Sequence, residues 1–517
     1  MVQIKRLLLG FLSSPSQTPL ESNHGPVPSK SIAVVGAGSA GLAMLRTLVE
    51  LEAFSRNNWE VVLYEERESV GGIWLPDNND VFPPEIPKTP LYPLLRTNTP
   101  VPSMTYPGFP FPPSTPLYPR HDHVEAYHLR YARRHNLLDF IKFDTMVEKA
   151  FWNGTPEEGY WNLTLSSKEG RMRYKTFDHL VVATGNNHIP HIPVWKGQED
   201  WLASPANHSR KIIHSVYYRG PEAFSNQTVL IVGNGGSGRD AATQILGYAS
   251  QTFMSIRRSY GPVDDGVIVK PDISHFTEAG VVFVDGTILD PDVILLGTGY
   301  EMQKPLLSEG GELSFDPTAK DNSSVRGTLV TNGHYIFPLH RHIFSLSPRY
   351  PPNALAFIGL LSFIASCPSD IAQSLFAAHA ILDPSILPPR HLLLEELASY
   401  EDKARRQGLD PYLKGPIMLN NTSNDYQDEL VEYLKQKNAI PDDGKKFVEE
   451  WRREILAYHY LQRGWSRIEK LGMGPAWTEG VKTEAQWFDL MTRVNEWQKN
   501  WETENGIAFR VDLDLTG

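Results

Sequence analysis

The chain has 517 residues, of which 41% are hydrophobic and 21% are charged, a composition typical of a large globular enzyme with several domains. Its formal net charge is −11 and no basic stripe stands out, which argues against a nucleic-acid partner. The single cysteine, Cys367, excludes an internal disulfide and a redox-active cysteine pair.

Residues 1–30 are rich in serine and proline and are expected to form a flexible extension. Two cations precede a short apolar run at residues 7–12, which is shorter than the core of a typical signal peptide. A disordered extension is therefore favoured, with a targeting signal as the alternative. No apolar stretch approaches the roughly 18 residues of a membrane helix. We expect a cytoplasmic protein without a membrane span.

The first βαβ pattern has a strand at residues 32–35, the loop "GAGSAG" and a helix. Gly36 permits a tight turn, Gly38 lets the backbone approach a diphosphate, and Gly41 allows close packing of the helix on the strand. Ser39 lies at the helix N-terminus, where free N–H groups and a partial positive charge favour phosphates. The pattern predicts a dinucleotide site.

The strand that follows, at residues 60–64, delivers Glu65 at its end. A carboxylate there accepts hydrogen bonds from ribose hydroxyls and would repel a 2′-phosphate. This unit is therefore expected to hold an adenine dinucleotide that lacks the extra phosphate.

A proline-rich segment follows, with thirteen prolines from Pro83 to Pro119. Since proline removes a backbone donor and fixes φ, the segment is predicted to be neither helix nor central strand. Long ordered coils of this kind are uncommon and usually functional. Four aromatic side chains favour packing over a solvated linker: Tyr92, Tyr106, Phe109 and Phe111.

A helical pattern at residues 124–134 overlaps "HDHVEAYH", which places three histidines close together. No cysteine or clear set of carboxylates completes a metal shell, so no metal site is predicted. The apolar strand "LVVATG" then ends at a glycine turn.

A second unit of the same layout begins at Thr228. Its loop "GNGGSG" carries Gly233, Gly235 and Gly238 in the places of the first loop's glycines, with Ser237 beside the last of them. The same sequence occupies a phosphate-loop position and not the nucleophile elbow of a hydrolase. A second dinucleotide site is predicted here.

The second strand of this unit, at residues 252–256, delivers Arg257 and Arg258. Cations there suit a 2′-phosphate through charge-assisted hydrogen bonds, whereas the alternative is a solvated pair at a strand end. We therefore predict NADPH at this site and FAD, as the most economical hydride acceptor, at the first. One cysteine cannot serve a disulfide reductase, so the electrons pass to oxygen, a quinone or another acceptor.

The expected fold class is α/β, with two Rossmann-like dinucleotide-binding domains, a discontinuous FAD domain and a helix-rich C-terminal region. An amphipathic pattern at residues 447–471 is interpreted as packing surface, with a partner or membrane helix as the weaker alternative. The expected divisions are an N-terminal extension at 1–30, the first part of the FAD domain at 31–186, the NADPH domain at 187–325, and the second part of the FAD domain with the helical region at 326–517.

Several segments between residue 31 and about residue 380 resemble the flavin-containing monooxygenase family. They are "YEERESVGGIW" with Glu65, Gly71, Gly72 and Trp74, "LLRTNTPVPSMTYPGFPFP", "HSVYYR", "DVILLGTGY", "HRHIFSL" and "LAFIGL". Together these motifs are specific for that family, although no single motif would be.

The resemblance departs from the family at its identifying motif. His208 and Arg210 stand where the family has Phe and Gly, so only His214 and Tyr218 carry that match. The Baeyer–Villiger variant of the motif ends in Trp-Pro, where this chain has Tyr218 and Arg219. A dedicated ketone-oxidising enzyme is therefore the less similar relative.

The resemblance implies that Asn98 lies at the flavin ring and helps to hold NADP⁺, a role that suits a neutral amide able to donate and accept. The alternative is an Asx turn within "TNTP". Thr97, Gly72, Ile73 and Trp74 join the cofactor-binding residues on the same resemblance.

The activity implied is NADPH-dependent, FAD-mediated transfer of one oxygen atom from O₂ to a small organic substrate, through a flavin hydroperoxide and most simply at nitrogen or sulfur. The alternatives are Baeyer–Villiger oxidation of a ketone, an NADPH oxidase that releases peroxide, and a scaffold without turnover. The expected partners are the substrate and O₂, and a homo-oligomer is compatible with the sequence.

Overall fold

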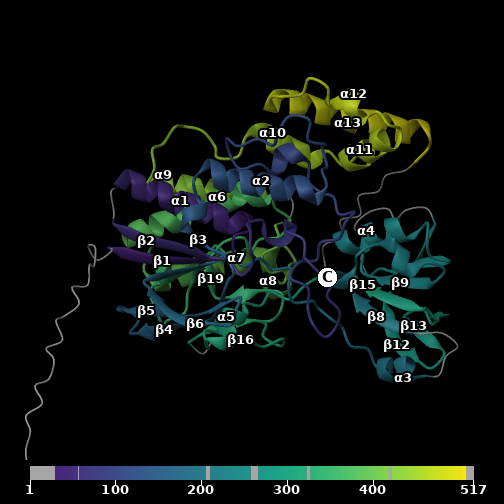
Figure 1. Ribbon diagram of the computed structural model, residues 1–517, viewed down its shortest axis with the longest axis horizontal. Coiled ribbons are helices and arrows are strands. Elements are labelled where there is room, and N and C mark those ends of the chain that lie inside the picture. The colour runs from purple at the N-terminus through teal and green to yellow at the C-terminus, as the bar shows by residue number, and fades with distance from the viewer. Residues whose placement is uncertain are drawn as a thin grey trace, which may run out of the picture.

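The computed structural model describes residues 29–55, 58–204, 210–257, 266–322, 327–418 and 422–507. Two α/β units lie side by side, and a layer of C-terminal helices lies across them at the top of the view (Figure 1). This arrangement confirms the predicted fold class. Arg258 and His208 lie outside the described residues.

The first sheet takes its strands from both sides of the second unit in the sequence. From edge to edge they are β19 (Leu339–His340), β20 (Phe344–Ser345), β21 (Leu355–Phe357), β7 (His179–Val182), β1 (Lys30–Val35), β2 (Trp59–Tyr64) and β3 (Ile141–Lys142). β1 pairs in parallel with β2 and β7, and β21 pairs in parallel with β7. The first unit is therefore discontinuous, because the chain returns after the second unit to complete the sheet.

Both faces of the first sheet are covered, which is why β1 is apolar on both sides. Ile32 and Val34 pack against helices, whereas Ala33 and Val35 pack toward an antiparallel sheet. The helices are α1 (Ser39–Ser55), α2 (His121–Arg134), α6 (Ser366–Leu382) and α9 (Thr422–Gln436). The antiparallel sheet consists of β4 (Thr145–Gly154), β5 (Gly159–Ser167) and β6 (Met172–Phe177).

The second sheet is parallel throughout, with the order β11 (Val267–Lys270), β10 (Gln251–Ser255), β9 (Thr228–Val232), β15 (Val293–Leu296) and β8 (Lys211–His214). Val229 and Ile231 of β9 face α4 (Gly236–Ile245), whereas Leu230 and Val232 face the opposite side. That side carries α3 (Gln198–Ala203), β12 (Ile273–Thr277), β13 (Gly280–Phe283) and β14 (Ile288–Leu289). Each unit thus runs strand, glycine loop, helix, strand, antiparallel sheet and strand, which confirms the predicted repeat.

The remaining elements extend the first unit and build the helical layer. A small sheet contains β16 (Leu313–Phe315), β17 (Leu329–Thr331) and β18 (Ile336–Phe337). The other helices are α5 (Pro305–Glu309), α7 (Arg390–Arg406), α8 (Pro411–Lys414), α10 (Glu450–Glu454), α11 (Leu461–Lys470), α12 (Gly474–Thr478) and α13 (Glu484–Glu504). The amphipathic pattern at 447–471 is therefore interrupted, since residues 455–460 separate α10 from α11.

The proline-rich segment is ordered coil with short 3₁₀ turns, as predicted, and its aromatic side chains pack inward. Tyr106 stacks on Tyr131 with ring centroids 3.8 Å apart, and Phe111 stacks on Tyr127 at 3.9 Å. These contacts confirm packing over a solvated linker.

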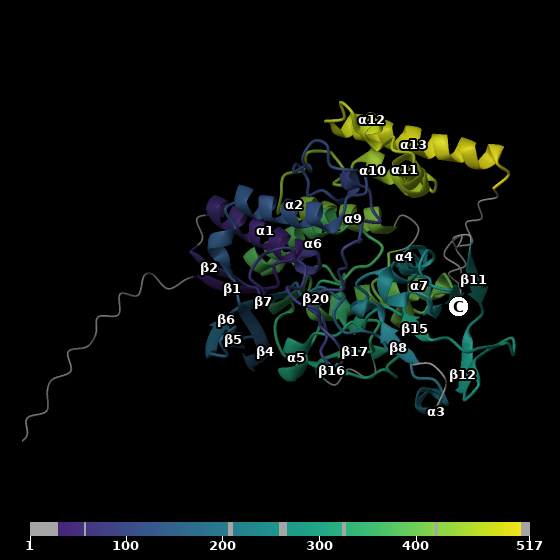
Figure 2. The same ribbon diagram turned by 45° about the vertical axis from the view of Figure 1, so that its right-hand side comes forward.

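The C-terminal helices cover this segment, as Figure 2 shows from a second angle. Arg452 of α10 is 7% exposed and donates to the carbonyl oxygens of Pro102 and Ser103 at 2.8 and 2.9 Å, and to Thr105 Oγ1 at 3.0 Å. Leu461 and Trp465 of α11 pack in one buried cluster with Leu117 and Tyr118 of the segment. The helical layer therefore fixes the coil that runs below it.

The chain crosses between the two units twice, and the two crossings bond to each other. His191 N donates to Gly299 O at 2.9 Å, and Glu301 N donates to Ile189 O at 2.8 Å. Lys304, which is 1% exposed, donates to Asn186 Oδ1 at 2.9 Å and to the Gly185 carbonyl. The crossings thus form a two-stranded ribbon.

Among the described residues, every helix is too short or too polar to cross a lipid bilayer.

The contacts of Arg452 predict its contribution to stability. Arg452→Met would remove three buried hydrogen bonds. Of their acceptors, only the Pro102 carbonyl keeps a second donor among the described residues, Thr105 Oγ1, and we expect a loss of about 3 kcal/mol in unfolding free energy. Thermal unfolding would report this, and limited proteolysis would show faster cleavage within residues 99–105. Arg493→Met is the control, because Arg493 pairs with Asp489 at the surface, where such a pair contributes only about 0.5 kcal/mol. Equal effects of the two variants would contradict the assigned role.

Candidate nucleotide and active site

The first glycine loop brings α1 against β1 at a separation that only glycine permits. A Cβ atom built on Gly41 would lie 1.8 Å from the carbonyl oxygen of Gly36, and one on Gly36 would lie 2.6 Å from that of Ala183. Gly36 also has φ +99°, a left-handed conformation that favours glycine. The free N–H groups at the start of α1 therefore lie at the carboxyl edge of the sheet, and no acidic side chain occupies the first turn.

Glu65 is fixed beside this loop at the end of β2. Its side chain is 6% exposed; Oε2 accepts from Ala37 N at 2.6 Å and Oε1 accepts from Arg67 N at 2.9 Å. Burial raises the pKa of Glu65, and the two backbone hydrogen bonds lower it. Each carboxylate oxygen has a second lone pair, so Glu65 can still accept from a ligand hydroxyl.

The glycine pair of the "GGIW" segment lies directly against the first loop. Gly71 N donates to Ala37 O at 3.0 Å, and a Cβ atom on Gly72 would lie 3.0 Å from Gly38 Cα. Ile73 and Trp74 complete a short 3₁₀ turn that begins at Gly72. Two backbone segments without side chains thus face each other, as a nucleotide diphosphate requires.

The proline-rich segment places Thr97 and Asn98 between the two units. Thr97 is buried; its N–H donates to Pro119 O at 3.0 Å, and its Oγ1 has no hydrogen-bond partner within the described residues. Asn98 is exposed, and its Nδ2 lies 4.0 Å from where a Cβ atom on Gly236 would stand. Asn98 therefore reaches the N-terminus of α4, although it follows β2 in the sequence.

A second contact holds the proline-rich segment to α4. Tyr92 OH donates to the carboxylate of Asp240, and the Tyr92 ring meets Tyr218 edge to face with centroids 5.1 Å apart. The predicted motif residue Tyr218 thereby joins the segment to the second unit.

The second loop repeats the steric arrangement of the first. Cβ atoms on Gly238 and Gly233 would lie 2.1 Å from Gly233 O and 2.7 Å from Gly297 O. Gly235 is open, with no atom within 4 Å of its Cβ position, and Ser237 is exposed beside it. Asn234 is 4% exposed, and its Nδ2 has no hydrogen-bond partner in the described part of the chain.

The charge that follows the second strand differs from that of the first unit. Arg257 is exposed just beyond β10, one residue after Ile256, which takes the place that Glu65 has beyond β2. The two loops thus have the same backbone arrangement with side chains of opposite charge.

His214 links the second sheet to the ribbon. Its Nδ1 accepts from Val216 N at 3.1 Å, and its Nε2 lies 2.9 Å from Gly299 O. Burial lowers the pKa of His214 to about 4, so the ring is neutral at pH 7 and its Nε2–H donates to the carbonyl. The motif histidine is a structural link between β8 and the second crossing.

Comparisons with known proteins agree with these features. The family model described as flavin-binding monooxygenase-like matches residues 29–263. FMO GS-OX5, a flavin-containing monooxygenase of Arabidopsis thaliana, is 29% identical over 463 residues, which cover 84% of this chain and 89% of the relative. The chain is thus similar to flavin-containing monooxygenases over most of its length, as the sequence motifs predicted. On these matches it is a flavin-dependent monooxygenase.

Solved structures share the fold of this monooxygenase. The S-allyl-L-cysteine S-oxygenase of Allium sativum has 24% identity and a TM-score of 0.68, with 91% of this chain and 99% of that chain covered. Tmm from Pelagibacter sp. strain HTCC7211 has 21% identity and a TM-score of 0.65, with 84% and 91% covered.

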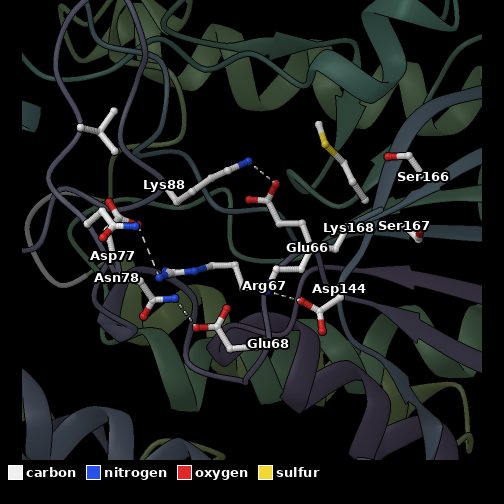
Figure 3. Close-up of a pocket in the computed structure, with 13 residues that line it drawn as sticks. Glu66, Arg67, Glu68, Asp77, Asn78, Lys88, Asp144, Ser166, Ser167 and Lys168 are labelled. Atoms are coloured by element: carbon white, nitrogen blue, oxygen red, sulfur yellow. Dashed lines mark hydrogen bonds and ion pairs between the residues drawn. The ribbon is translucent and has the colours of Figure 1, made fainter. Parts of the chain in front are cut away.

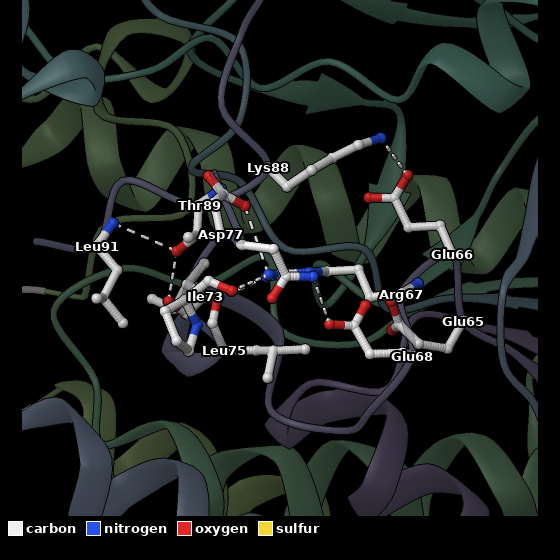
Figure 4. Close-up of polar contacts among 12 residues, drawn as sticks. Glu65, Glu66, Arg67, Glu68, Ile73, Leu75, Asp77, Lys88, Thr89 and Leu91 are labelled. Carbon is white, nitrogen blue, oxygen red and sulfur yellow. Dashed lines mark hydrogen bonds and ion pairs between the residues drawn. The ribbon is translucent and has the colours of Figure 1, made fainter. Parts of the chain in front are cut away.

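Sequence reasoning missed Arg67, which holds the monooxygenase's "GGIW" turn in place. Its guanidinium donates to the carbonyl oxygens of Leu75 and Pro76 at 2.6 and 2.5 Å and lies 3.4 Å from Asp77 (Figure 4). Thr89 Oγ1 donates to Ile73 O at 2.5 Å from the other side. An arginine two residues after the acidic position gave no signal by itself, because its partners are backbone carbonyls.

A polar pocket of about 390 Å³ is lined in part by Arg67 and Asp77 of this network (Figure 3). Its charges pair with each other: Lys88 Nζ lies 2.6 Å from Glu66, and Lys168 Nζ lies 3.5 Å from Asp144. A flavin ring or an organic substrate requires a largely apolar cavity, so this pocket does not suit either.

The three histidines of "HDHVEAYH" lie along α2 and are not gathered on one ligand. His128 is buried with its Nε2 3.9 Å from Cys367 Sγ, and burial lowers its pKa to about 4. Within the described residues, no group of three metal-binding side chains is close enough to hold an ion.

Because the Cβ position of Gly235 is open, a substitution there should affect dinucleotide binding without affecting folding. Gly235→Ala should leave the thermal midpoint unchanged, because the methyl group meets nothing and φ is −68°. The KM for NADPH should rise about tenfold, since the methyl group would occupy the diphosphate's approach. Gly247→Ala is the matched control at a second open glycine. Unchanged NADPH binding in Gly235→Ala would show that no dinucleotide approaches this backbone.

Proposed function

We propose that the chain binds FAD at the loop before α1 and NADPH at the loop before α4. We further propose that it transfers one oxygen atom from O₂ to nitrogen or sulfur of a small organic substrate. The observation that carries this proposal is the pair of matching loops followed by opposite charges, Glu65 and Arg257.

The residues at the first loop suit FAD. The backbones of Gly38 and Gly72 face each other without side chains, and Thr97 Oγ1 is buried with an unused hydrogen-bonding capacity. Glu65 is a fixed acceptor for ribose hydroxyls, and its charge disfavours a 2′-phosphate there.

The residues at the second loop suit NADPH. Asn234 Nδ2 is a buried donor without a protein partner, and Gly235 leaves room for a diphosphate. The exposed guanidinium of Arg257 can bind a 2′-phosphate through two parallel hydrogen bonds.

When bound, the two nucleotides supply the hydride and the activation of oxygen. The chain's own residues bind, orient and shield them. Asn98 reaches α4 from the first unit, so its amide can donate to and accept from groups at the junction of the two sites. Tyr92 holds the same segment on Asp240 and thereby fixes where Asn98 lies. Exclusion of water from this junction limits the loss of reducing equivalents as hydrogen peroxide.

Tyr218 and Arg219 support a soft nucleophile as substrate over a ketone, because the Baeyer–Villiger variant of the motif has Trp-Pro there. The test is turnover of NADPH by the purified yellow protein under ¹⁸O₂ with a thioether, a tertiary amine and a cyclic ketone. One labelled oxygen in the sulfoxide or N-oxide is expected. A lactone alone would establish the Baeyer–Villiger alternative, and peroxide alone would establish an oxidase. Absence of flavin and of NADPH turnover would leave a scaffold.

Arg257 should discriminate between the two nicotinamide cofactors. Arg257→Gln would remove the charge that pairs with the 2′-phosphate, and we expect kcat/KM for NADPH to fall about 100-fold, with NADH nearly unchanged. Steady-state kinetics with both cofactors measure this, and Lys270→Gln, at the end of neighbouring β11, serves as a control. An equal loss for both cofactors would show that Arg257 does not contact the phosphate.

Asn98 should control how much NADPH is lost as peroxide. Asn98→Ala is expected to retain FAD, because the side chain is exposed and its removal leaves no cavity in the core. The peroxide released per NADPH should rise several-fold, since the amide no longer fixes the junction. Asn78→Ala, whose amide donates to Glu68 at the polar pocket, is the control. Unchanged coupling in Asn98→Ala would contradict its assigned role.

A further inference from the structure

An unpaired buried carboxyl group lies behind the first nucleotide loop. Asp370, on α6, is 2% exposed, and its Oδ2 has no hydrogen-bond partner among the described residues. A Cβ atom built on Gly359 would lie 3.5 Å from Asp370 Oδ1 and 3.0 Å from the Cβ atom of Ala40. Asp370 therefore lies where the end of β21 meets the first turn of α1.

Asp370 is connected to the nucleotide site through Ser39, the first residue of α1. Burial raises the pKa of Asp370 to about 7, and a hydrogen bond from the Ser39 side chain opposes this rise. Tyr106 OH donates to the Ser39 carbonyl at 2.8 Å. Ser39 thus faces the expected diphosphate on one side and a buried acid on the other.

The groups around Asp370 titrate in other ranges of pH. Burial raises the pKa of the Cys367 thiol, of Tyr106 and of Tyr426 well above neutrality. His128, which faces Cys367 from α2, has a pKa lowered to about 4 by burial. Two cations act on this cluster: Arg452 lowers the pKa of Cys367 and Arg341 lowers that of Tyr426. Glu65, with a pKa raised by burial, is the other carboxylate at the loop.

Ionised and neutral Asp370 have opposite consequences for an anion at the N-terminus of α1. The free N–H groups and the helix dipole give this end of α1 a partial positive charge that favours a diphosphate. An ionised Asp370 carboxylate beside Ser39 would offset that positive charge and repel the diphosphate through a medium of low dielectric. A neutral Asp370 leaves the positive end of α1 to the cofactor.

We propose that Asp370 is a positioning residue that acts through Ser39 as a proton-dependent switch. The first loop then binds the cofactor's diphosphate tightly only when the carboxyl group of Asp370 is neutral. This inference rests on the proposed binding of FAD at the first loop. A diphosphate raises the pKa of a neighbouring acid, so that FAD binding takes up a proton from solvent. The affinity for FAD is then highest below the pKa of the free protein and falls as pH rises through it.

The test is the dissociation constant of FAD from the full-length protein between pH 6 and pH 9, followed by the fluorescence of released FAD. We expect the wild-type affinity to fall about tenfold across this range. Asp370→Asn, which is neutral at every pH, should bind FAD as tightly as the acidic wild type with no slope. Calorimetry in two buffers of different ionisation enthalpy should show proton uptake for the wild type and none for Asp370→Asn.

Two further variants keep the proposal decidable if Asp370→Asn folds poorly. Ser39→Ala removes the hydrogen bond that lowers the pKa, so the break in the pH profile should shift to higher pH. Glu312→Gln changes a buried acid that pairs with Arg349 far from the loop, and its profile should match the wild type. A wild-type slope that persists in Asp370→Asn would assign the proton to a group other than Asp370 and overturn the proposal. FAD binding without pH dependence would overturn it alone, whereas no FAD binding at any pH would overturn the proposed function.

Discussion

The contact between a helix and the turn that precedes it is the constraint on which both nucleotide sites depend. At Gly41 and Gly238 a single methyl group would overlap a backbone carbonyl at 1.8 and 2.1 Å. Only this close approach brings the first N–H groups of α1 and α4 to the carboxyl edges of their sheets. The buried strands, the covering helices and the antiparallel sheets keep these two contacts rigid.

The same backbone arrangement can serve two different ligands, because the side chains that differ between the two units lie outside the glycine loops. Glu65 is buried and held by two backbone N–H groups, whereas Arg257 is exposed at the corresponding strand end. The proposed function therefore uses the same phosphate-binding backbone twice and assigns the choice of nucleotide at each loop to the charge after the second strand. The proline-rich segment then brings Asn98 from one unit to the other, which neither repeat could do alone.

Much of the fold could be predicted from the sequence because its signals are local. Strand, glycine loop, helix and acidic or basic strand end fall within a few tens of residues at β1 and at β9, and both units form as predicted. Long-range partners gave no such signal: Arg67 binds carbonyl groups, and Asp370 meets Ser39 from a distant helix. The pattern at 447–471 predicted an apolar face but not its interruption after residue 454, where the chain forms a 3₁₀ turn.

The two crossings between the units join as a ribbon, and this limits how the units can move. Backbone hydrogen bonds join His191 to Gly299 and Glu301 to Ile189, so the two crossings cannot slide along each other without breaking them. Tyr92 of the proline-rich segment also bonds to Asp240 of α4, so the two units are linked at a second place. The two links together fix the spacing of the two glycine loops, with Lys304 buried at the base of the ribbon. A change in the angle between the loops would therefore have to break the contact of Tyr92 with Asp240 as well as bend the ribbon.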